Sequence, residues 1–288
     1  MKQPLIPQEN IVIAPYTSMR VGGAVRYLYR PETVDQLTDL VLSCRKENIP
    51  YLVIGNASNL LFPDEGFAGT VIATTGIKGL TLQDGKIIST CGVSLSSLSV
   101  FAMEHGLNGL AFAYGIPGTV GGGVYMNAGA YGGEISDCLE SVLVLDQDGT
   151  TRTLSREELS LSYRHSRLQE EELILLSATF RCEVGDPAEI KKEMDRNMAA
   201  RKEKQPLEYP SCGSAFKRPA GHFAGALIQE AGLKGFSIGG AQVSEKHAGF
   251  VINTGGATAD DVKALLAHVQ KTVLHESGVL LEPEIKIL

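Results

Sequence analysis

The stretch Gly115-Ile-Pro-Gly-Thr-Val-Gly-Gly-Gly-Val-Tyr-Met-Asn-Ala-Gly-Ala-Tyr-Gly132 is the most informative part of this 288-residue chain. It contains seven of the 32 glycines, set among small apolar residues and without any Asp, Glu, Lys or Arg. Dense glycine is used where the backbone takes a positive φ or approaches another group closely, and it weakens regular helices and strands. A disordered linker would carry charge or serine instead. We therefore expect a folded loop wrapped against a large ligand; the alternative is a glycine-rich turn region without a ligand.

A second segment with binding character is Val53-Ile-Gly-Asn-Ala-Ser-Asn-Leu-Leu61. Here a short apolar strand runs into small hydrogen-bonding residues, whose backbone N–H groups can form a nest for a pyrophosphate. Segments of this kind also occur as plain turns. The chain lacks the Gly-Lys-Ser/Thr ending of a P-loop, and the glycine-rich stretch lacks the G-x-G-x-x-G fingerprint. Neither of the two common nucleotide-binding loops is therefore expected.

Composition and charge exclude several classes of protein. The chain is 43% hydrophobic and 20% charged, as is usual for globular proteins, and its formal charge of −7 argues against nucleic-acid binding. Five cysteines without a C-x-x-C pair fit free thiols in a reducing compartment. The polar residues 1–10, with Pro4 and Pro7, predict no signal peptide, and no apolar run approaches a membrane span of about 20 residues. His222 and His247 lack zinc-site spacing, so no metal is expected. A soluble, cytoplasmic protein is predicted.

Helix and strand patterns alternate along the chain and then give way to hairpins, which predicts an α+β fold. Helices are expected at 34–41 and beyond, 95–104, 187–204, 223–231 and from Thr258 onward. Strands are expected at 51–54, 70–74, near 237 and 250, and at 282–288, with Asp-Gly hairpins at 80–88 and 142–154. Pro206 and Pro210 mark a domain boundary.

Together with Tyr16-Thr-Ser-Met-Arg-Val-Gly-Gly23, these segments resemble the UDP-N-acetylenolpyruvoylglucosamine reductase (MurB) family, flavoenzymes of bacterial peptidoglycan synthesis. The resemblance spans nearly the whole chain, in order. Its further motifs are Ser162-Tyr-Arg-His-Ser166, Cys212-Gly-Ser-Ala-Phe-Lys-Arg-Pro219, Gly239-Gly-Ala-Gln-Val-Ser-Glu-Lys-His-Ala-Gly-Phe-Val-Ile-Asn253 and Leu281-Glu-Pro-Glu284. The interval between Tyr163 and Arg201 is short, which resembles the shorter, type II-like subclass.

The resemblance implies a vanillyl-alcohol-oxidase/PCMH-type FAD-binding fold with two subdomains, residues 1–75 and 76–200. An α+β substrate domain, residues 201–288, would follow, with its C-terminal strand returning to the flavin site. FAD is expected to be non-covalent, because no matching tether is present; Cys91 and His105 are the residues that could act as one. The implied cofactor-binding residues are Arg20, Gly22, Gly55, Asn56, Ala57, Ser58, Asn59, Leu60, Gly115, Pro117, Gly118, Gly121, Gly122, Asn127, Ala128 and Gly129.

Three residues match the catalytic positions of the family, Arg164, Ser214 and Glu284. Reduction of an enol ether requires a hydride at one carbon, a proton at its neighbour and stabilisation of the intervening negative charge. The resemblance implies that Arg164 and Glu284 stabilise that charge and that Ser214, not Cys212, donates the proton. From local sequence alone, Arg164 reads as a surface ion-pair residue and Ser214 as a turn residue.

The resemblance also implies NADPH as reductant and a small nucleotide-sugar substrate. The densest basic group consists of Arg201, Lys204, Lys217 and Arg218, which we expect to bind its diphosphate. A monomer without nucleic-acid or membrane partners is expected. Two alternatives remain, an FAD-dependent oxidase of the same flavin fold and a non-catalytic nucleotide-sugar binding protein.

One position departs from the family pattern. The turn usually reads Gly-x-Gly-Ser-Asn, whereas Ala57 stands at its second glycine. If that position has a positive φ, alanine there is strained by about 1 kcal/mol.

Overall fold

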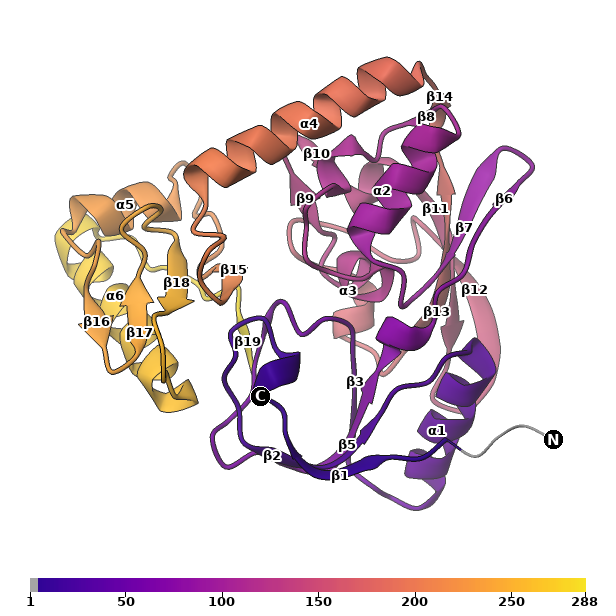
Figure 1. The fold of residues 1–288 in the computed structure, drawn as a ribbon, viewed down its shortest axis with the longest axis horizontal. Helices are drawn as coiled ribbons and strands as arrows, with labels where there is room; N and C mark the ends of the chain where they lie inside the picture. The colour runs from indigo at the N-terminus through magenta and orange to yellow at the C-terminus, as the bar shows by residue number, and fades with distance from the viewer. Residues whose placement is uncertain (1–4) are drawn as a thin grey trace. The chain divides into compact units, whose positions relative to one another are not determined.

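The computed structural model describes residues 5–288. The prediction of no signal peptide rests partly on residues 1–4, which lie outside the described residues. Within residues 5–288, no helix combines the length and hydropathy needed to cross a bilayer. The chain forms two compact units (Figure 1). Unit 1 comprises the described residues up to Gln8, Tyr27–Asn56 and Gly69–Arg201, and unit 2 comprises Glu9–Arg26, Ala57–Ala68 and Lys202–Leu288.

The main sheet of unit 1 is antiparallel and has the strand order β12-β11-β13-β7-β6. Its strands are β6 (Leu80–Gln83), β7 (Lys86–Thr90), β11 (Leu139–Leu145), β12 (Thr151–Ser155) and β13 (Ile174–Arg181). Both predicted hairpins are confirmed. In the first, Asp84 and Gly85 have φ values of 51° and 73°, the conformation that favours Asp-Gly in two-residue turns.

Four helices belong wholly or mainly to unit 1: α1 (Val34–Lys46), α2 (Leu95–Glu104), α3 (Val120–Tyr125) and α4 (Pro187–Lys204). Thr33 and Ser94 accept backbone hydrogen bonds at the starts of α1 and α2, where sequence predicted helices. The helix α3 was not predicted, because three consecutive glycines disfavour a helix. It packs against β13 and β7, and its Val120 and Val124 belong to the core of this unit.

A further sheet has the order β1-β2-β5-β3. Its strands are β1 (Gln8–Val12), β2 (Ala24–Tyr29), β3 (Tyr51–Ile54) and β5 (Phe67–Ala73), and β3 pairs with β5 in parallel. The chain passes from one unit to the other at five places: within β1, within β2, between Asn56 and Ala57, within β5 and in the last turn of α4. Unit 1 also has two short antiparallel pairs, β8 (Leu107–Asn108) with β14 (Glu183–Val184), and β9 (Gly129–Ala130) with β10 (Gly133–Glu134).

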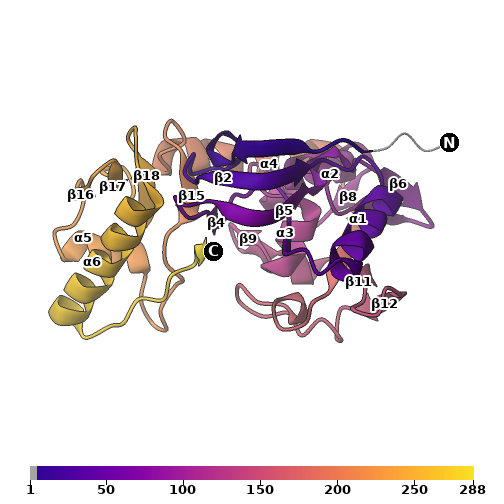
Figure 2. The ribbon, with the colours of Figure 1, turned by 90° about the horizontal axis from the view of Figure 1, so that it is seen from below.

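Unit 2 contains a four-stranded antiparallel sheet of order β15-β18-β17-β16, with α6 packed on β16 and β17 (Figure 2). Its elements are β15 (Ser211–Ser214), α5 (Ala224–Glu230), β16 (Ser237–Ile238), β17 (Ala241–Val243), β18 (Phe250–Asn253) and α6 (Ala259–Ser277). Thr258 and Asp261 form a capping box at the start of α6, and the predicted stripe Val262, Leu265, Leu266 and Val269 is buried.

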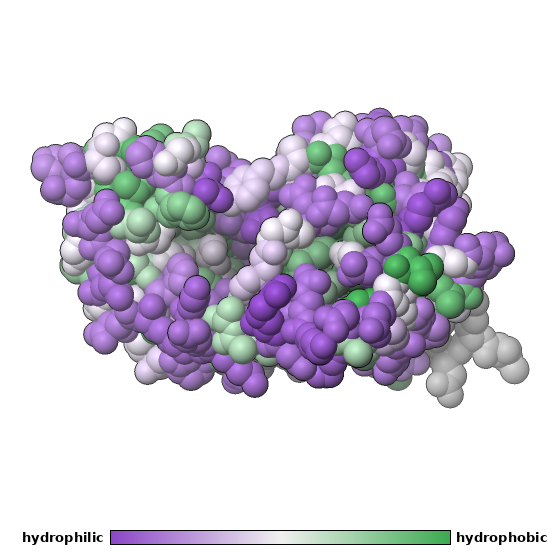
Figure 3. Space-filling model, turned by 90° about the horizontal axis from the view of Figure 1, so that it is seen from above, coloured by the Kyte–Doolittle hydropathy of each residue, from purple (hydrophilic) through white to green (hydrophobic). Residues whose placement is uncertain are grey.

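The C-terminal strand is shorter than predicted. Only β19 (Lys286–Ile287) is a strand, and it pairs in parallel with β4 (Leu60–Leu61). Pro283 has no N–H to donate to a ladder and makes only an isolated bridge with Phe216. Ile285 is buried, whereas Ile287 is 48% exposed. Hydrophilic residues dominate the surface seen in Figure 3, and hydrophobic ones form small scattered patches there.

Candidate active site

Backbone strain gathers at the residues that the sequence predicted as a site. Nine described residues other than glycine have a positive φ, and four of them are predicted site residues. These four are Arg20 (φ 55°), Ala57 (46°), Asn127 (40°) and Arg164 (56°). Positive φ values are uncommon outside glycine, and strained residues cluster at ligand sites. The family glycine position does adopt a positive φ here, so Ala57 carries the expected strain.

In unit 1, the turn at Gly55 and Asn56 packs directly on the glycine-rich loop. The Asn56 Nδ2 atom donates to the Pro117 carbonyl at 3.0 Å. A side-chain carbon at Gly55 would lie 2.3 Å from Thr119 Oγ1, so only glycine lets the two segments meet. Asn56, Pro117 and Gly122 remain exposed. Two glycine-containing segments therefore pack closely and leave residues of both exposed. Backbone N–H groups of such segments can bind an anion, which fits a large cofactor carrying a pyrophosphate.

The glycines of α3 serve close packing inside unit 1. Gly121 donates its N–H to the Cys91 carbonyl at 2.8 Å, and a Cβ there would lie 3.2 Å from the same oxygen. A Cβ at Gly123 would lie 3.0 Å from the Leu95 side chain. Thr119 caps the start of this helix, because its Oγ1 accepts the Gly122 N–H. Part of the predicted loop is therefore a short helix. Glycine at positions 121 and 123 lets this helix pack closely, because a larger residue would not fit at either position.

Asn127 is fully buried and holds the end of the glycine-rich segment. Its Nδ2 donates to Glu134 Oε1 and to the Ser162 carbonyl, both at 3.0 Å, while its Oδ1 accepts the Ser136 N–H at 2.9 Å. These bonds satisfy the amide and explain how a positive φ persists at this position. The neighbouring Ala128 and Gly129 are partly exposed.

Arg164, the predicted catalytic arginine, lies between β12 and β13 in unit 1. One of its guanidinium nitrogens donates to the Gly129 carbonyl at 3.2 Å, and the guanidinium lies 4.9 Å from the centre of the Tyr163 ring. Gln169 Nε2 donates to the carbonyls of Arg164 and Tyr125 at 3.0 and 2.8 Å. The guanidinium is thus oriented beside the predicted cofactor segment 127–129.

In unit 2, two further predicted cofactor segments lie side by side. The Ser18 N–H donates to the Ala57 carbonyl at 3.3 Å. A Cβ at Gly22 would lie 2.6 Å from the Phe62 side chain, so the segments at 16–23 and 57–62 are in direct contact. Arg20, predicted to bind the cofactor, is exposed.

Unit 2 also brings together two predicted catalytic residues. The Glu284 N–H donates to the carbonyl of Ala215, the residue after Ser214, at 2.9 Å. The Glu284 carbonyl in turn accepts a bond from Asn59 Nδ2 at 2.9 Å. Ser214 is exposed at the end of β15, in a strand rather than the expected turn, and follows Gly213 at φ 74°. The predicted cofactor residue Asn59 is therefore bonded directly to the predicted catalytic residue Glu284.

The cysteines close to these segments have structural roles. Cys212 is 4% exposed and donates to the Leu60 carbonyl at 3.5 Å, and burial raises its pKa to about 12. Cys91 is 1% exposed, and burial likewise raises its pKa to about 12. A thiol this buried is a poor nucleophile. His105, the other residue able to tether a flavin, bonds the Phe101 carbonyl within its own helix turn.

The predicted diphosphate-binding residues differ in environment. Arg201 is buried at the end of unit 1, 5.5 Å from the centre of the Tyr131 ring, and burial lowers its pKa. Lys217 pairs with Glu282, and Arg218 stacks 4.0 Å over the exposed Phe223 ring. Lys204 is exposed.

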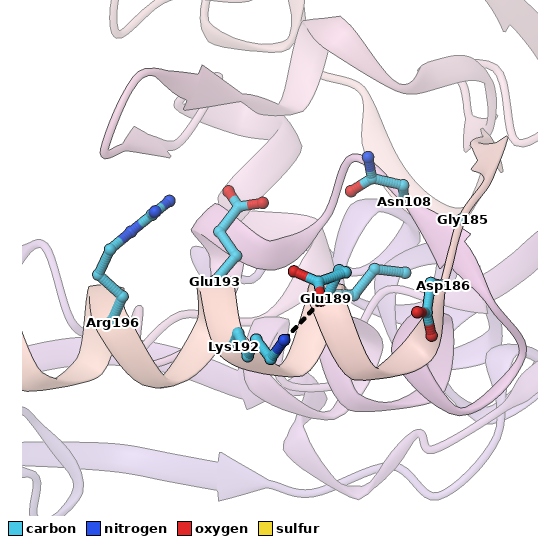
Figure 4. Close-up of a pocket in the computed structure, with 8 residues that line it drawn as sticks. Asn108, Gly185, Asp186, Glu189, Lys192, Glu193 and Arg196 are labelled. Carbon is cyan, nitrogen blue, oxygen red and sulfur yellow. Dashed lines mark hydrogen bonds and ion pairs between the residues drawn. The ribbon is translucent and has the colours of Figure 1, made fainter.

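A hollow of about 460 Å³ beside the first half of α4 contains none of the predicted site residues (Figure 4). Its lining is polar, and Glu189 and Lys192 pair with each other there. Among the described residues, no group of three or more His, Cys, Asp or Glu could hold a metal ion.

Sequence reasoning missed two residues that position this site. Thr119 caps α3 and packs on Gly55, and the three glycines that follow Val120 concealed this cap in the sequence. Gln169 fixes the Arg164 backbone from a 3-10 turn, Arg167–Gln169, and no local pattern points to it.

The fold and these segments define a flavin-binding class of protein. Residues 25–155 match the sequence model of an FAD binding domain, and residues 205–288 match that of the UDP-N-acetylenolpyruvoylglucosamine reductase C-terminal domain. The α+β, PCMH-type flavin fold and the FAD cofactor predicted from sequence are confirmed.

Full-length relatives give the same result. A UDP-N-acetylenolpyruvoylglucosamine reductase of Lactobacillus delbrueckii subsp. bulgaricus is 49% identical over 98% of this chain and 95% of its own length. That of Listeria innocua is 47% identical over 97% of this chain and 94% of its own. The crystal structure of UDP-N-acetylenolpyruvylglucosamine reductase (MurB) from Thermus caldophilus has a TM-score of 0.85 and 36% identity, covering 99% of both chains. The chain belongs to the UDP-N-acetylenolpyruvoylglucosamine reductase family.

Proposed function

We propose that this chain reduces UDP-N-acetyl-3-O-(1-carboxyvinyl)-glucosamine to UDP-N-acetylmuramate, with NADPH as reductant, in peptidoglycan synthesis. Family membership supports the reaction over an oxidase or a non-catalytic binder. The observation that carries the proposal is the pairing of the Ser214 segment with the Glu284 segment inside unit 2, through the Ala215 carbonyl and the Glu284 N–H.

The residues present fit FAD, since the tight contact of Gly55 with Thr119 leaves a surface of small residues and accessible backbone. We propose that the segments 55–60 and 115–129 hold it, together with Arg20 and Gly22. When bound, FAD would supply the hydride-transfer chemistry between the nicotinamide and the substrate. The buried state of Cys91 supports non-covalent binding. An intact mass equal to that of the chain alone after denaturation is expected.

The chain's own residues perform the remaining tasks. The Arg164 guanidinium binds the substrate carboxylate with parallel hydrogen bonds, which a lysine cannot reproduce. Glu284 polarises the reacting double bond, and Ser214 Oγ donates a proton to the carbon beside the carboxylate. A serine is a weak acid, so this step requires a water-poor site. We propose that Arg201, Lys204, Lys217 and Arg218 bind the diphosphate.

The half-reactions of Ser214→Ala test this assignment. Hydride transfer from NADPH needs no proton from this hydroxyl, so flavin reduction should proceed at nearly the parent rate. Reoxidation by the enolpyruvyl sugar should slow by roughly 10²-fold or more, a typical contribution of a general acid. Ser214→Cys should recover part of the loss, because a thiol is the stronger acid. Stopped-flow absorbance without oxygen separates the two rates.

The matched control is Ser211→Ala, in the same strand, which should leave both half-reactions unchanged. If Ser214→Ala slows both halves equally, the serine is structural and the assignment is wrong.

The domain division is also a proposal: flavin subdomains at 1–75 and 76–200, and a substrate domain at 201–288. The C-terminal family match at 205–288 supports the second boundary. We further propose that the protein is a cytoplasmic monomer without nucleic-acid or membrane partners. Light scattering of the purified protein would test the monomeric state. The formal charge of −7 supports the first of these absences.

A further inference from the structure

Two of the five cysteines, Cys138 and Cys182, meet in unit 1 and have no part in the proposed reaction. Cys138 follows the 3-10 turn Ile135–Asp137 and is 5% exposed. Cys182 lies in the one-residue break between β13 and β14 and is half-buried. The Arg181 N–H donates to the Cys138 carbonyl at 2.8 Å, so the chain at Cys182 runs directly beside Cys138. The Cys138 thiol donates to the Ile135 carbonyl at 3.7 Å and so lies inside this turn.

The two thiols are not equivalent. The neighbouring Cys138 thiol lowers the pKa of the half-buried Cys182, whereas the neighbouring Cys182 thiol and burial raise the pKa of Cys138, which is 5% exposed. Burial raises the pKa of Cys44 and takes those of Cys91 and Cys212 to about 12. The thiolate is the nucleophilic form, so an accessible sulfur with a lowered pKa reacts first. Cys182 has both properties, and a second sulfur lies within its reach.

We propose that Cys138 and Cys182 form a peroxide-sensitive dithiol, in which Cys182 attacks the oxidant and Cys138 resolves the product. The Cys182 thiolate attacks one oxygen of hydrogen peroxide, the O–O bond breaks, and hydroxide leaves. This oxidises the sulfur by two electrons to a sulfenic acid and reduces the peroxide. The Cys138 sulfur then attacks the sulfenic sulfur. The S–O bond breaks, and the departing hydroxide takes the Cys138 proton to form water, leaving a disulfide.

The location gives this disulfide a defined effect on the fold. Ser136, in the turn just before Cys138, donates its N–H to Asn127, a proposed cofactor residue. A bond between Cys138 and Cys182 would fasten that turn to the end of β13. It would also remove the Cys182 sulfenic acid before further, irreversible oxidation.

The experiment titrates the purified holoenzyme with hydrogen peroxide, alkylates the remaining thiols and maps tryptic peptides without reduction. A linked pair of peptides containing Cys138 and Cys182 is expected, and dithiothreitol should separate it. Cys182 should be consumed about tenfold or more faster than Cys44, following its larger thiolate fraction.

Three variants sharpen the result. Cys138→Ser should accumulate a sulfenic acid at Cys182 that dimedone traps, and Cys182→Ser should leave Cys138 unoxidised. Cys44→Ser is the matched control and should form the linked peptides like the parent. Because Cys182 is half-buried at a strand break, Cys182→Ser keeps the test available if the buried Cys138 variant fails to fold. Oxidation of Cys182 to sulfinic acid without linkage, or faster oxidation of Cys44 in the parent, would overturn the proposal.

Discussion

The substitution Gly55→Ala tests whether the turn at 55 and the glycine-rich loop form one packed surface in unit 1. The new Cβ would lie 2.3 Å from Oγ1 and 3.0 Å from Cγ2 of Thr119. Ordinary van der Waals contact begins at 3.4 Å, so the overlap with Oγ1 is 3.4 − 2.3 = 1.1 Å. Thr119 is only 2% exposed, so its side chain cannot rotate away into solvent.

Two losses follow from this overlap. Forcing a methyl group into a filled interior destabilises by about 1–3 kcal/mol. Moving Thr119 also breaks the bond from the Gly122 N–H to its Oγ1, and loss of such a helix cap costs about 1 kcal/mol. Gly55→Ala should thus lower the free energy of unfolding by about 2–4 kcal/mol.

Urea unfolding of the flavin-free protein, followed by circular dichroism, measures this loss, and flavin retention on a desalting column gives a second reading. In the background Thr119→Ala the nearest atom is the Thr119 Cβ position at 3.2 Å, so adding Gly55→Ala should cost less than about 1 kcal/mol. A coupling energy of about 2 kcal/mol is therefore expected. Gly122→Ala is the control for the urea series alone, since its new Cβ has 3.8 Å to the nearest atom. Strictly additive costs at 55 and 119 would refute this packing.

Three further predictions concern unit 2. Asp64→Ala should lower the free energy of unfolding by about 1–2 kcal/mol, because both carboxylate oxygens accept backbone N–H groups at the start of α6, and exposed Glu65→Ala is its control in the same urea series. Backbone hydrogen bonds lower the pKa of Asp261, so its stabilisation is present above the ordinary value of 3.8 and is lost as the pH falls through the lower folded pKa; Asp261→Asn should flatten the acid limb of stability, and an unchanged limb would contradict this. Lys217→Ala should weaken binding of the nucleotide sugar by about 1.5–3 kcal/mol in calorimetry while leaving flavin reduction by NADPH nearly unchanged, and an unaltered dissociation constant would remove this residue from the site.

Local signals predicted both hairpins and, apart from α3, the α-helices of the described residues. The boundaries of α2 and the start of α6 follow from a capping residue before an apolar periodic run, as at Ser94 and Thr258. These signals act over one helical turn, so neighbouring residues suffice to read them. The parallel pairing of β4 with β19 could not be predicted from the sequence, because each strand has two residues, too few to show a period of two. Strand order depends on contacts far apart in sequence, which no local pattern encodes.

The predicted site residues needed the family resemblance for a physical reason. Arg20, Ala57 and Arg164 have positive φ values, which their residue types disfavour, so propensity points away from the conformations they adopt.

Such conformations persist only where distant partners hold them. The Ser18 N–H binds the Ala57 carbonyl, the Ser136 N–H binds the Asn127 side chain, and the Gln169 side chain binds the Arg164 carbonyl. Each of these bonds comes from a segment outside the strained turn. Composition and periodicity describe each segment alone, whereas the site arises from bonds between segments. Its residues can therefore be read from sequence only by comparison with a family in which the same bonds are already formed.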